Sequence, residues 1–150
     1  MDATELKVIL DQHKLWIESG RKKGKSANLQ GAYLQSANLE GANLQSADLQ
    51  SADLRSANLE SANLEGADLR GADLRGADLR GANLRDADLR DADLQDANLE
   101  GATFDLNFKK VAYFQNATFS EDQIAWVCLH PRFSEWADSL KWVKSDKLSA

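Results

Sequence analysis

The chain has 150 residues, a formal net charge of −6 at pH 7 and a single cysteine, Cys128. This length fits one domain, and a lone cysteine excludes an internal disulfide bond and favours a reducing compartment. The first residues lack the basic start and apolar core of a signal peptide, and no apolar run is long enough to span a membrane. We therefore expect a cytoplasmic protein that does not act at a membrane.

Residues 1–24 are predicted to form an N-terminal capping helix followed by a basic linker. The helix is expected over residues 4–19, with Thr4 as its N-cap and Gly20 at its end. Its apolar face comprises Leu6, Ile9, Leu10, Trp16 and Ile17, widened by Val8 and Leu15. The basic residues 21–25 could form a nucleic-acid or targeting patch, but a solvated linker beside an acidic body is the favoured interpretation.

A five-residue pattern fills the chain from Ala27 to Phe104. Alanine recurs at every fifth position up to Ala102, leucine recurs from Leu29 to Leu99, and Phe104 takes the next leucine position. A helix would spread these leucines around its circumference, and a straight strand would send successive leucines to opposite faces. The last residue of each repeat is glycine, serine or aspartate, which favour turns. The pattern therefore predicts a solenoid that turns every five residues and keeps alanine and leucine inside.

A second period, of twenty residues, appears at the position between alanine and leucine. When the repeats are read in groups of four, aspartate tends to hold the first two of these positions and asparagine the last two. We infer a twenty-residue coil with four faces. Recent duplication of a twenty-residue unit is a compatible explanation of the same period.

The tandem Ala-(Asp/Asn)-Leu-x-x pattern resembles the pentapeptide repeat proteins over about half of the chain. The resemblance implies an all-β solenoid, a right-handed quadrilateral β-helix with leucine, phenylalanine and alanine inside. It identifies no activity, and the presence of an N-terminal helix in a short member suggests a bacterial, cyanobacterial-like source. The expected interior positions include Ala27, Leu29, Leu34, Leu39, Ala67, Leu69, Leu74, Leu79, Leu99, Ala102, Phe104, Phe114 and Phe119.

The solenoid is expected over residues 25–119, with an irregular coil at 105–111. Leu106 and Phe108 are expected to point inward one residue early, which predicts a distorted corner or bulge. Phe114 and Phe119 then return to the five-residue register.

Residues 120–150 are predicted to form a C-terminal helical cap. Ser120–Gln123 has the form of a capping box, so a helix is expected to about Leu129, and a second helix begins near Ser134. Helical caps at both ends would cover the open strand edges and the last layers of leucine. The expected cap residues are Trp16, Ile17, Trp126, Trp136 and Trp142, with Leu140 and Val143 on the second helix.

The sequence offers no set of residues with catalytic or metal-binding spacing. His13 and His130 fall on opposite flanks, and Cys128 lies in an apolar stretch that favours a buried, inert thiol. The charged segment 85–96 could attract a divalent cation, but its aspartates are spread over successive corners and its arginines compete with a metal. We therefore predict neither an enzyme, nor a cofactor, nor a metal site.

The outward side chains give the predicted interaction surface. Residues twenty apart are expected to stack about 4.8 Å apart, so aspartates and arginines form alternating columns whose charges offset each other. The candidate surface residues are Arg55, Asp68, Arg70, Asp73, Arg75, Asp88, Arg90 and Asp93. On the other two faces, asparagine columns could form neutral ladders. A solvated surface without a partner is the alternative interpretation.

These features favour a non-catalytic protein that binds a protein partner through its regular surface. Direct nucleic-acid binding is not expected, because residues 27–104 hold 14 acidic and 6 basic residues. The alternative follows from the resemblance: some family members are acidic dimeric rods that occupy the DNA site of a type II topoisomerase, DNA gyrase, and protect it from quinolones. Such members dimerise through C-terminal helices, so a homodimer through residues 120–150 belongs to this alternative.

Overall fold

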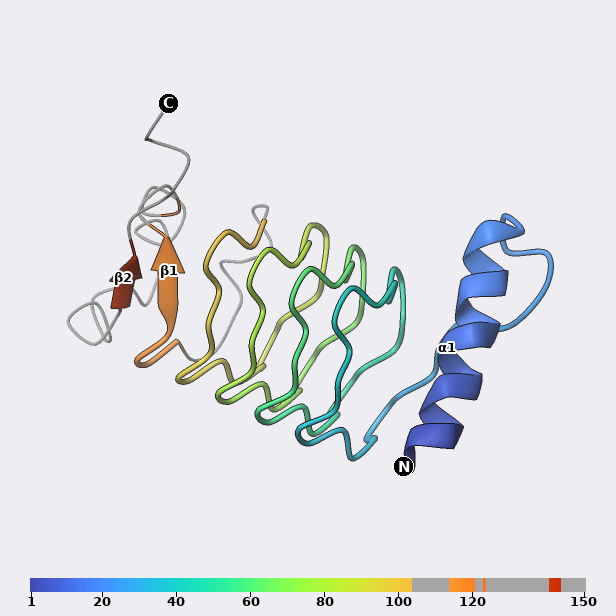
Figure 1. Ribbon diagram of the computed structural model, residues 1–150, viewed down its shortest axis with the longest axis horizontal. Coiled ribbons are helices and arrows are strands. Elements are labelled where there is room, and N and C mark those ends of the chain that lie inside the picture. The colour runs from blue at the N-terminus through green and yellow to red at the C-terminus, as the bar shows by residue number, and fades with distance from the viewer. Residues whose placement is uncertain (104–113, 121–122, 124–140, 144–150) are drawn as a thin grey trace.

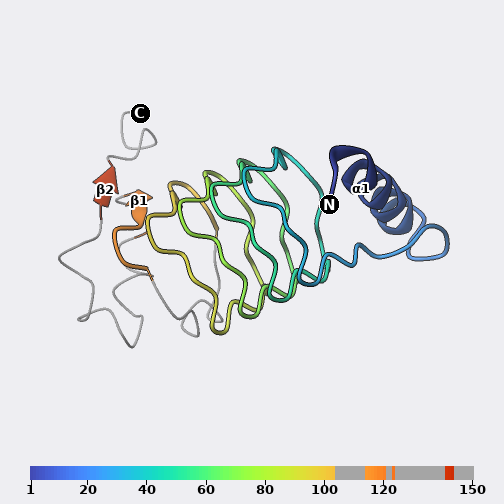
Figure 2. The ribbon, with the colours of Figure 1, turned by 90° about the horizontal axis from the view of Figure 1, so that it is seen from below.

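The computed structural model describes residues 1–103, 114–120, 123 and 141–143. Its elements are helix α1 (Ala3–Glu18) and the strands β1 (Thr118–Ser120) and β2 (Lys141–Val143). A stack of coils lies between α1 at one end and the β1–β2 pair at the other, as two perpendicular views agree (Figures 1 and 2).

The coils are four-sided, as the twenty-residue period predicts. Every described bridge between coils joins residues twenty apart in parallel, from Asn28↔Asp48 to Asn98↔Thr118. The first face carries Asn28, Asp48, Asp68 and Asp88, and the second carries Tyr33, Asp53, Asp73 and Asp93. The third face carries Asn38, Asn58, Asp78, Asn98 and Thr118, and the fourth carries Asn43, Asn63, Asn83 and Thr103. Each side contributes a single bridge residue, because the straight run between two corners is too short for a longer strand.

One repeat satisfies all five of its backbone N–H groups. In the repeat Asp68–Ala72, the N–H of Asp68 bonds to the preceding coil, and those of Leu69 and Gly71 bond to the following coil. The Arg70 N–H bonds to the Asp68 carboxylate at 3.2 Å, and the Ala72 N–H bonds to the Leu69 carbonyl at 3.0 Å. The aspartate or asparagine therefore has a local role as the acceptor of an Asx turn.

The corners are type II turns. The alanine N–H bonds to the leucine carbonyl three residues earlier, and the residue before the alanine has a positive φ, from 54° at Ser56 to 68° at Gly101. A type II turn requires this left-handed conformation at its third position, which explains the glycine, serine and aspartate found there.

The interior is a continuous column of leucine and alanine. All leucines from Leu29 to Leu99 that occupy the repeat position are buried, with at most 3% of their surface exposed. Phe114 and Phe119 are fully buried and meet edge to face at 5.6 Å between ring centroids. Of the interior positions named above, those that the structure describes are all buried. Phe104 and the irregular coil at 105–111 lie outside the described residues.

Helix α1 begins earlier than predicted. Its N-cap is Asp2 and not Thr4: the Asp2 carboxylate accepts from the Glu5 N–H at 2.8 Å, and the Glu5 carboxylate accepts from the Asp2 N–H at 3.0 Å. This reciprocal capping box satisfies two N–H groups at once, which Thr4 does not do. The helix ends at Glu18 with Ser19 as its C-cap, and Gly20 follows with a positive φ of 64°.

The helix packs on the first coil with part of the predicted apolar face. Leu6, Ile9 and Leu10 contact the interior column, but Val8 and Leu15 are exposed at 57% and 41%. The prediction that these two residues widen the packed face was wrong, because both side chains are exposed to solvent. The alanines of the first coil, Ala32, Ala37 and Ala42, remain half-buried at this end.

The basic linker is folded against α1. The Ser19 hydroxyl accepts from the N–H groups of Lys22 and Lys23, and the Lys25 N–H bonds to the Gln12 carbonyl. Arg21 stacks over the Trp16 ring at 5.0 Å from its centroid. Residues 21–25 therefore form an ordered return from α1 to the first coil.

The C-terminal end differs from the predicted pair of helices. Trp142 and Val143 lie in β2, which pairs in parallel with β1 in the register Phe119↔Trp142. The helical assignment of these residues was wrong, because their backbone groups pair with the exposed edge of the last coil. Trp126, Trp136, the helix to Leu129 and most of the predicted dimer interface lie outside the described residues.

Gln123 closes the last described coil. Its side-chain carbonyl accepts from the Ser120 N–H at 2.7 Å and from the Ser120 hydroxyl at 2.9 Å. Its amide nitrogen donates to the carbonyls of Leu99 and Ala102 at 2.8 and 2.7 Å. The side-chain contact expected of the capping box at Ser120–Gln123 is therefore present.

Candidate interaction surface

The outward residues of the first two faces form regular charged columns. Asp48, Asp68 and Asp88 stack on the first face, and Asp53, Asp73 and Asp93 stack on the second. The arginines follow two residues after an aspartate, so they lie beside the aspartate columns on the same faces. This arrangement confirms the predicted stacking.

Each of these arginines forms a bidentate ion pair with the aspartate of its own repeat, a contact that we call the arginine grip. Arg70 donates from Nε to Asp68 Oδ1 at 2.8 Å and from Nη2 to Asp68 Oδ2 at 2.5 Å. The same two-point contact joins Arg55 to Asp53, Arg75 to Asp73, Arg80 to Asp78 and Arg90 to Asp88. A planar guanidinium and a carboxylate suit this geometry, which lysine cannot reproduce.

The arginines also link neighbouring coils. Arg70 Nε lies 3.8 Å from Asp88 Oδ2 of the next coil, and Arg55 Nε lies 3.7 Å from Asp73 Oδ2. Each of these guanidinium groups therefore lies between two stacked carboxylates and reduces their repulsion. The arginines thus offset the repulsion between stacked aspartates, as the sequence predicts.

The arginines lower the pKa of the aspartates that they contact. Hydrogen bonds from Arg55, Arg70, Arg75, Arg80 and Arg90 are the largest cause of the lowered carboxyl pKa values, which burial opposes. The affected carboxyl groups are Asp53, Asp68, Asp73, Asp78 and Asp88. The same contacts raise the pKa of the arginines. Both charges are thus fixed at neutral pH, which gives these faces a constant pattern of alternating sign.

The paired groups remain accessible to a partner. Arg70 and Arg90 expose 40% and 50% of their side chains, and Asp68 and Asp88 expose 31% and 33%. Ion pairs this exposed contribute little to stability, because solvent screens them. Their regular order therefore gives a flat surface with a defined charge pattern more than it strengthens the fold.

The third and fourth faces carry mainly amides and glutamates. Asn83 donates to Asn63 at 3.4 Å, so the predicted asparagine ladder is confirmed at this step. Asn83 also donates to Glu65 at 3.1 Å, which the sequence does not predict. On the third face, Arg80 Nη2 bonds to Glu60 of the preceding coil at 2.7 Å.

The local arginine grip is the feature that sequence reasoning missed. The signal is the recurrent Asp-Leu-Arg triplet, in which the two charged residues lie on the same side of an extended segment. The columns were predicted from the period of twenty, but this contact within one repeat was not.

His13 is buried at the junction between α1 and the first coil. Its Nδ1 accepts from the Ala27 N–H at 2.9 Å, and its ring stacks on Trp16 at 5.5 Å between centroids. Burial lowers the pKa of His13, although the nearby Gln45 backbone favours the charged form. Nε2 makes no hydrogen bond of normal geometry, so His13 is a neutral packing residue of the cap.

The described residues hold no group of three or more metal-ligating side chains. His130 and Cys128 lie outside the described part of the chain. Within that part, no helix has both the length and the apolar composition needed to cross a bilayer.

The comparisons with known proteins agree with this architecture. A family model for pentapeptide repeats matches residues 27–66 and 67–105, in eight copies. A solved pentapeptide repeat protein from the Arabidopsis thaliana thylakoid lumen is 32% identical, covers 69% of this chain and 75% of its own, and superposes with a TM-score of 0.58. Another, from Nostoc Pcc 7120, is 32% identical, covers 89% of this chain and 93% of its own, and gives a TM-score of 0.53.

A more distant structure shares the fold. Trypsin-treated QnrB1 carrying R167E, a plasmid-mediated fluoroquinolone resistance protein, is 19% identical, covers 64% of this chain and 47% of its own, and gives a TM-score of 0.56. No curated protein sequence matches the chain.

Proposed function

Because this chain belongs to the pentapeptide repeat family, we propose that it is a non-catalytic cytoplasmic protein that binds a protein partner through its first two faces. The observation that carries the proposal is the arginine grip, which presents a rigid pattern of fixed, alternating charges on a flat surface. The candidate residues are Arg55, Asp68, Arg70, Asp73, Arg75, Asp88, Arg90 and Asp93.

The rigidity of this surface supports a binding role. The backbone N–H groups of the repeats bond within the solenoid, and the guanidinium groups are held at two points. A partner therefore meets side chains that lose little conformational freedom on binding, which lowers the entropic cost of association. Charges of alternating sign also select against partners with a mismatched pattern.

The test is charge reversal on one face with recovery of partners from a lysate of the source organism. The double variant Arg55→Glu with Arg75→Glu reverses the second face, and Arg70→Glu with Arg90→Glu reverses the first. Crosslinked partners identified by mass spectrometry are expected to lose at least about tenfold in recovery with one of the two variants. Unchanged recovery with both variants would show that these faces are not used.

DNA mimicry remains the alternative, and the charge geometry weighs against it. The printed name of QnrB1 concerns fluoroquinolone resistance in that protein, and a likeness at this identity shows the fold alone. Here Arg55, Arg70, Arg75 and Arg90 interrupt the acidic columns every few ångströms, unlike a run of phosphates. Inhibition of DNA gyrase supercoiling by micromolar protein would support this alternative, and no effect would exclude it.

A further inference from the structure

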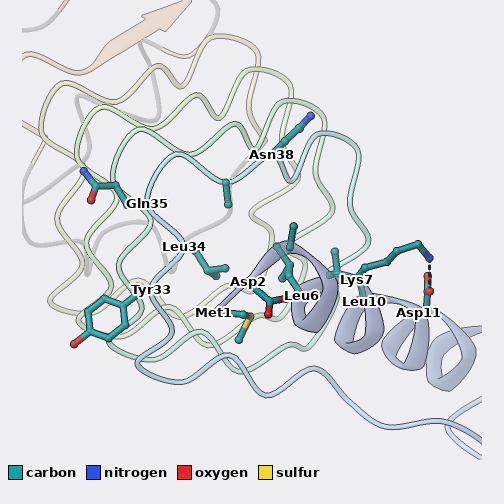
Figure 3. A pocket seen from close by; sticks show the side chains of 12 residues that line it. Met1, Asp2, Leu6, Lys7, Leu10, Asp11, Tyr33, Leu34, Gln35 and Asn38 are labelled. Atoms are coloured by element: carbon teal, nitrogen blue, oxygen red, sulfur yellow. Dashed lines mark hydrogen bonds and ion pairs between the residues drawn. The ribbon is translucent and has the colours of Figure 1, made fainter.

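Helix α1 leaves part of the solenoid end uncovered. A groove of about 460 Å³ lies between the helix and the first coil, and its lining includes Leu6, Leu10, Tyr33, Leu34 and Ala37. Figure 3 shows Leu6 on the helix side and Leu34 on the coil side of this groove. Tyr33 is 78% exposed at its rim, so the groove combines an apolar floor with an accessible edge.

The backbone along this edge has open hydrogen-bonding groups. In the next coil, three backbone groups bond to the coil before them. They are the N–H and the carbonyl of Asp53 and the carbonyl of Arg55. The equivalent groups of the first coil are those of Tyr33 and Gln35, and no described residue bonds to them. Asn38 repeats this arrangement on the third face. The groove is therefore bordered by the free edge of a parallel ladder.

The opposite end shows how such an edge is completed. There β2, which lies outside the repeats, pairs in parallel with β1 on the third face. Asn38 lies on this same face, four coils earlier in the stack. An added strand is thus compatible with the third face.

The charges beside this edge favour a basic occupant. The third face carries four carboxylates, of Glu40, Glu60, Asp78 and Glu100, and one arginine, Arg80. Glu60 is neutralised by Arg80 of the following coil, but Glu40 has no cationic partner among the described residues. Lys7, the only side-chain cation in the groove lining, is paired with Asp11 at 2.6 Å.

We propose that an extended basic segment of a partner protein binds here as a parallel strand along residues 37–40, on the third face. Its backbone pairs with Asn38, an apolar side chain enters the groove, and an arginine or lysine lies beside Glu40. Strand addition of this kind obtains affinity from main-chain hydrogen bonds and specificity from alternate side chains. The site rests on the proposed interaction role, but it lies on a different surface from the arginine columns.

The test uses a capped hexapeptide, Thr-Leu-Thr-Leu-Arg-Thr, titrated into the full-length protein and followed by amide NMR. The amide signals of residues 37–40 are expected to shift, and the hydrogen exchange of the Asn38 amide is expected to slow. Glu40→Lys is expected to weaken binding about fivefold, because it replaces an exposed ion pair by repulsion. The matched control, Glu100→Lys, makes the same charge change at the far end of the same face and should leave binding unchanged.

Three outcomes would overturn the site. The first is the absence of amide shifts at residues 37–40 with millimolar peptide. The second is equal binding of a peptide with glutamate in place of arginine. The third is a shift of the same amides with protein concentration alone, which would identify a second copy of this chain as the occupant. Binding through the arginine columns is tested with separate variants, so either proposal can fail while the other stands.

Discussion

The corner residues determine how tightly the chain can coil. Nine described corners are serine, aspartate or asparagine with positive φ, a conformation in which a side chain costs roughly 1–2 kcal/mol relative to glycine. Ser61 stacks under Gly81, where an added Cβ would meet only the Ser61 hydroxyl, at 3.6 Å. Space for a side chain is therefore available at this corner, and the backbone conformation alone determines the preference for glycine.

The corner pair Ser61 and Gly81 gives a matched prediction. Ser61→Gly is expected to raise the free energy of unfolding by roughly 0.5 kcal/mol, because relief of the left-handed strain exceeds the entropy gained by the unfolded chain. Gly81→Ala is expected to lower it by roughly 1 kcal/mol. Urea denaturation midpoints measure both changes, and a neutral Gly81→Ala variant would contradict the assignment of strain to the corners.

At the scale of elements, the return from α1 to the first coil depends on Gly24. A Cβ at this position would lie 2.3 Å from the Gln12 carbonyl oxygen and 2.8 Å from the Trp16 nitrogen, both backbone atoms of the helix. Gly24 also has a φ of 74°. The linker can thus lie along α1 only because this residue has no side chain.

Gly24→Ala is therefore expected to displace the linker and loosen the N-terminal cap. Gly20→Ala is the matched control, since Gly20 has a φ of 64° but nothing within 4 Å of an added Cβ. Hydrogen exchange of the Lys25 and Ala27 amides should accelerate by at least about tenfold in Gly24→Ala and far less in Gly20→Ala. Equal effects in the two variants would mean that steric contact with the helix is unimportant.

Because His13 is buried where α1 meets the first coil, we expect the stability of the N-terminal cap to depend on pH. Burial lowers the pKa of His13, so the unfolded chain binds more protons than the folded chain below about pH 6.5. This contribution to stability is complete above pH 6.5 and is lost as the pH falls toward the folded pKa, by at most about 1.4 kcal/mol per pH unit. Protonation of Nδ1 would also break its bond from Ala27.

The measurement is the free energy of unfolding between pH 7 and 5, compared with a His13→Gln variant. Glutamine keeps an acceptor but does not titrate, so the variant is expected to show a flatter profile. The difference between the two profiles removes any contribution from His130. Identical slopes would rule out the junction as the source of the pH dependence.

At the scale of the whole molecule, the arginine–aspartate pairs make the stability of the solenoid depend on pH in the acidic range. The pKa values of Asp53, Asp68, Asp73, Asp78 and Asp88 are lowered in the folded state. Their contribution is therefore present above the unfolded pKa of about 3.9 and is lost as the pH falls through the lower folded values. Because the pairs are spread over several coils, we expect stability to decline across the whole solenoid below pH 4.

An arginine-deficient variant tests this expectation. Arg70→Gln with Arg90→Gln removes the grips on the first face, so its stability should depend less steeply on pH between 4 and 2.5. At pH 7 the loss should be small, because the pairs are exposed and solvent screens them. Thermal unfolding at low salt measures both values. A larger loss at neutral pH would indicate that the columns repel strongly without their arginines.

Much of the solenoid was determined by the sequence itself. A period of five fits neither a helix nor a straight strand, so the corners and the leucine and alanine interior follow from that spacing. The stacking of residues twenty apart follows from the second period. The columns of Asp68 and Arg70 could be placed for the same reason. In such a repeat, each coil contacts only its nearest neighbours, so its structure depends on its own residues and theirs.

The ends and the fine contacts were decided only by the tertiary structure. The exposure of Val8 and the strand at Trp142 depend on which surface a segment meets, and the segments outside the repeats have no period that reveals it. The Asp2 cap, by contrast, is a local contact with Glu5 that the sequence alone could have indicated. The two-point grip of Arg70 on Asp68 required the actual side-chain geometry. For the two ends of the molecule the physical reason is that a repeated segment meets copies of itself, whereas a flanking segment meets an edge that lies far from it in the sequence.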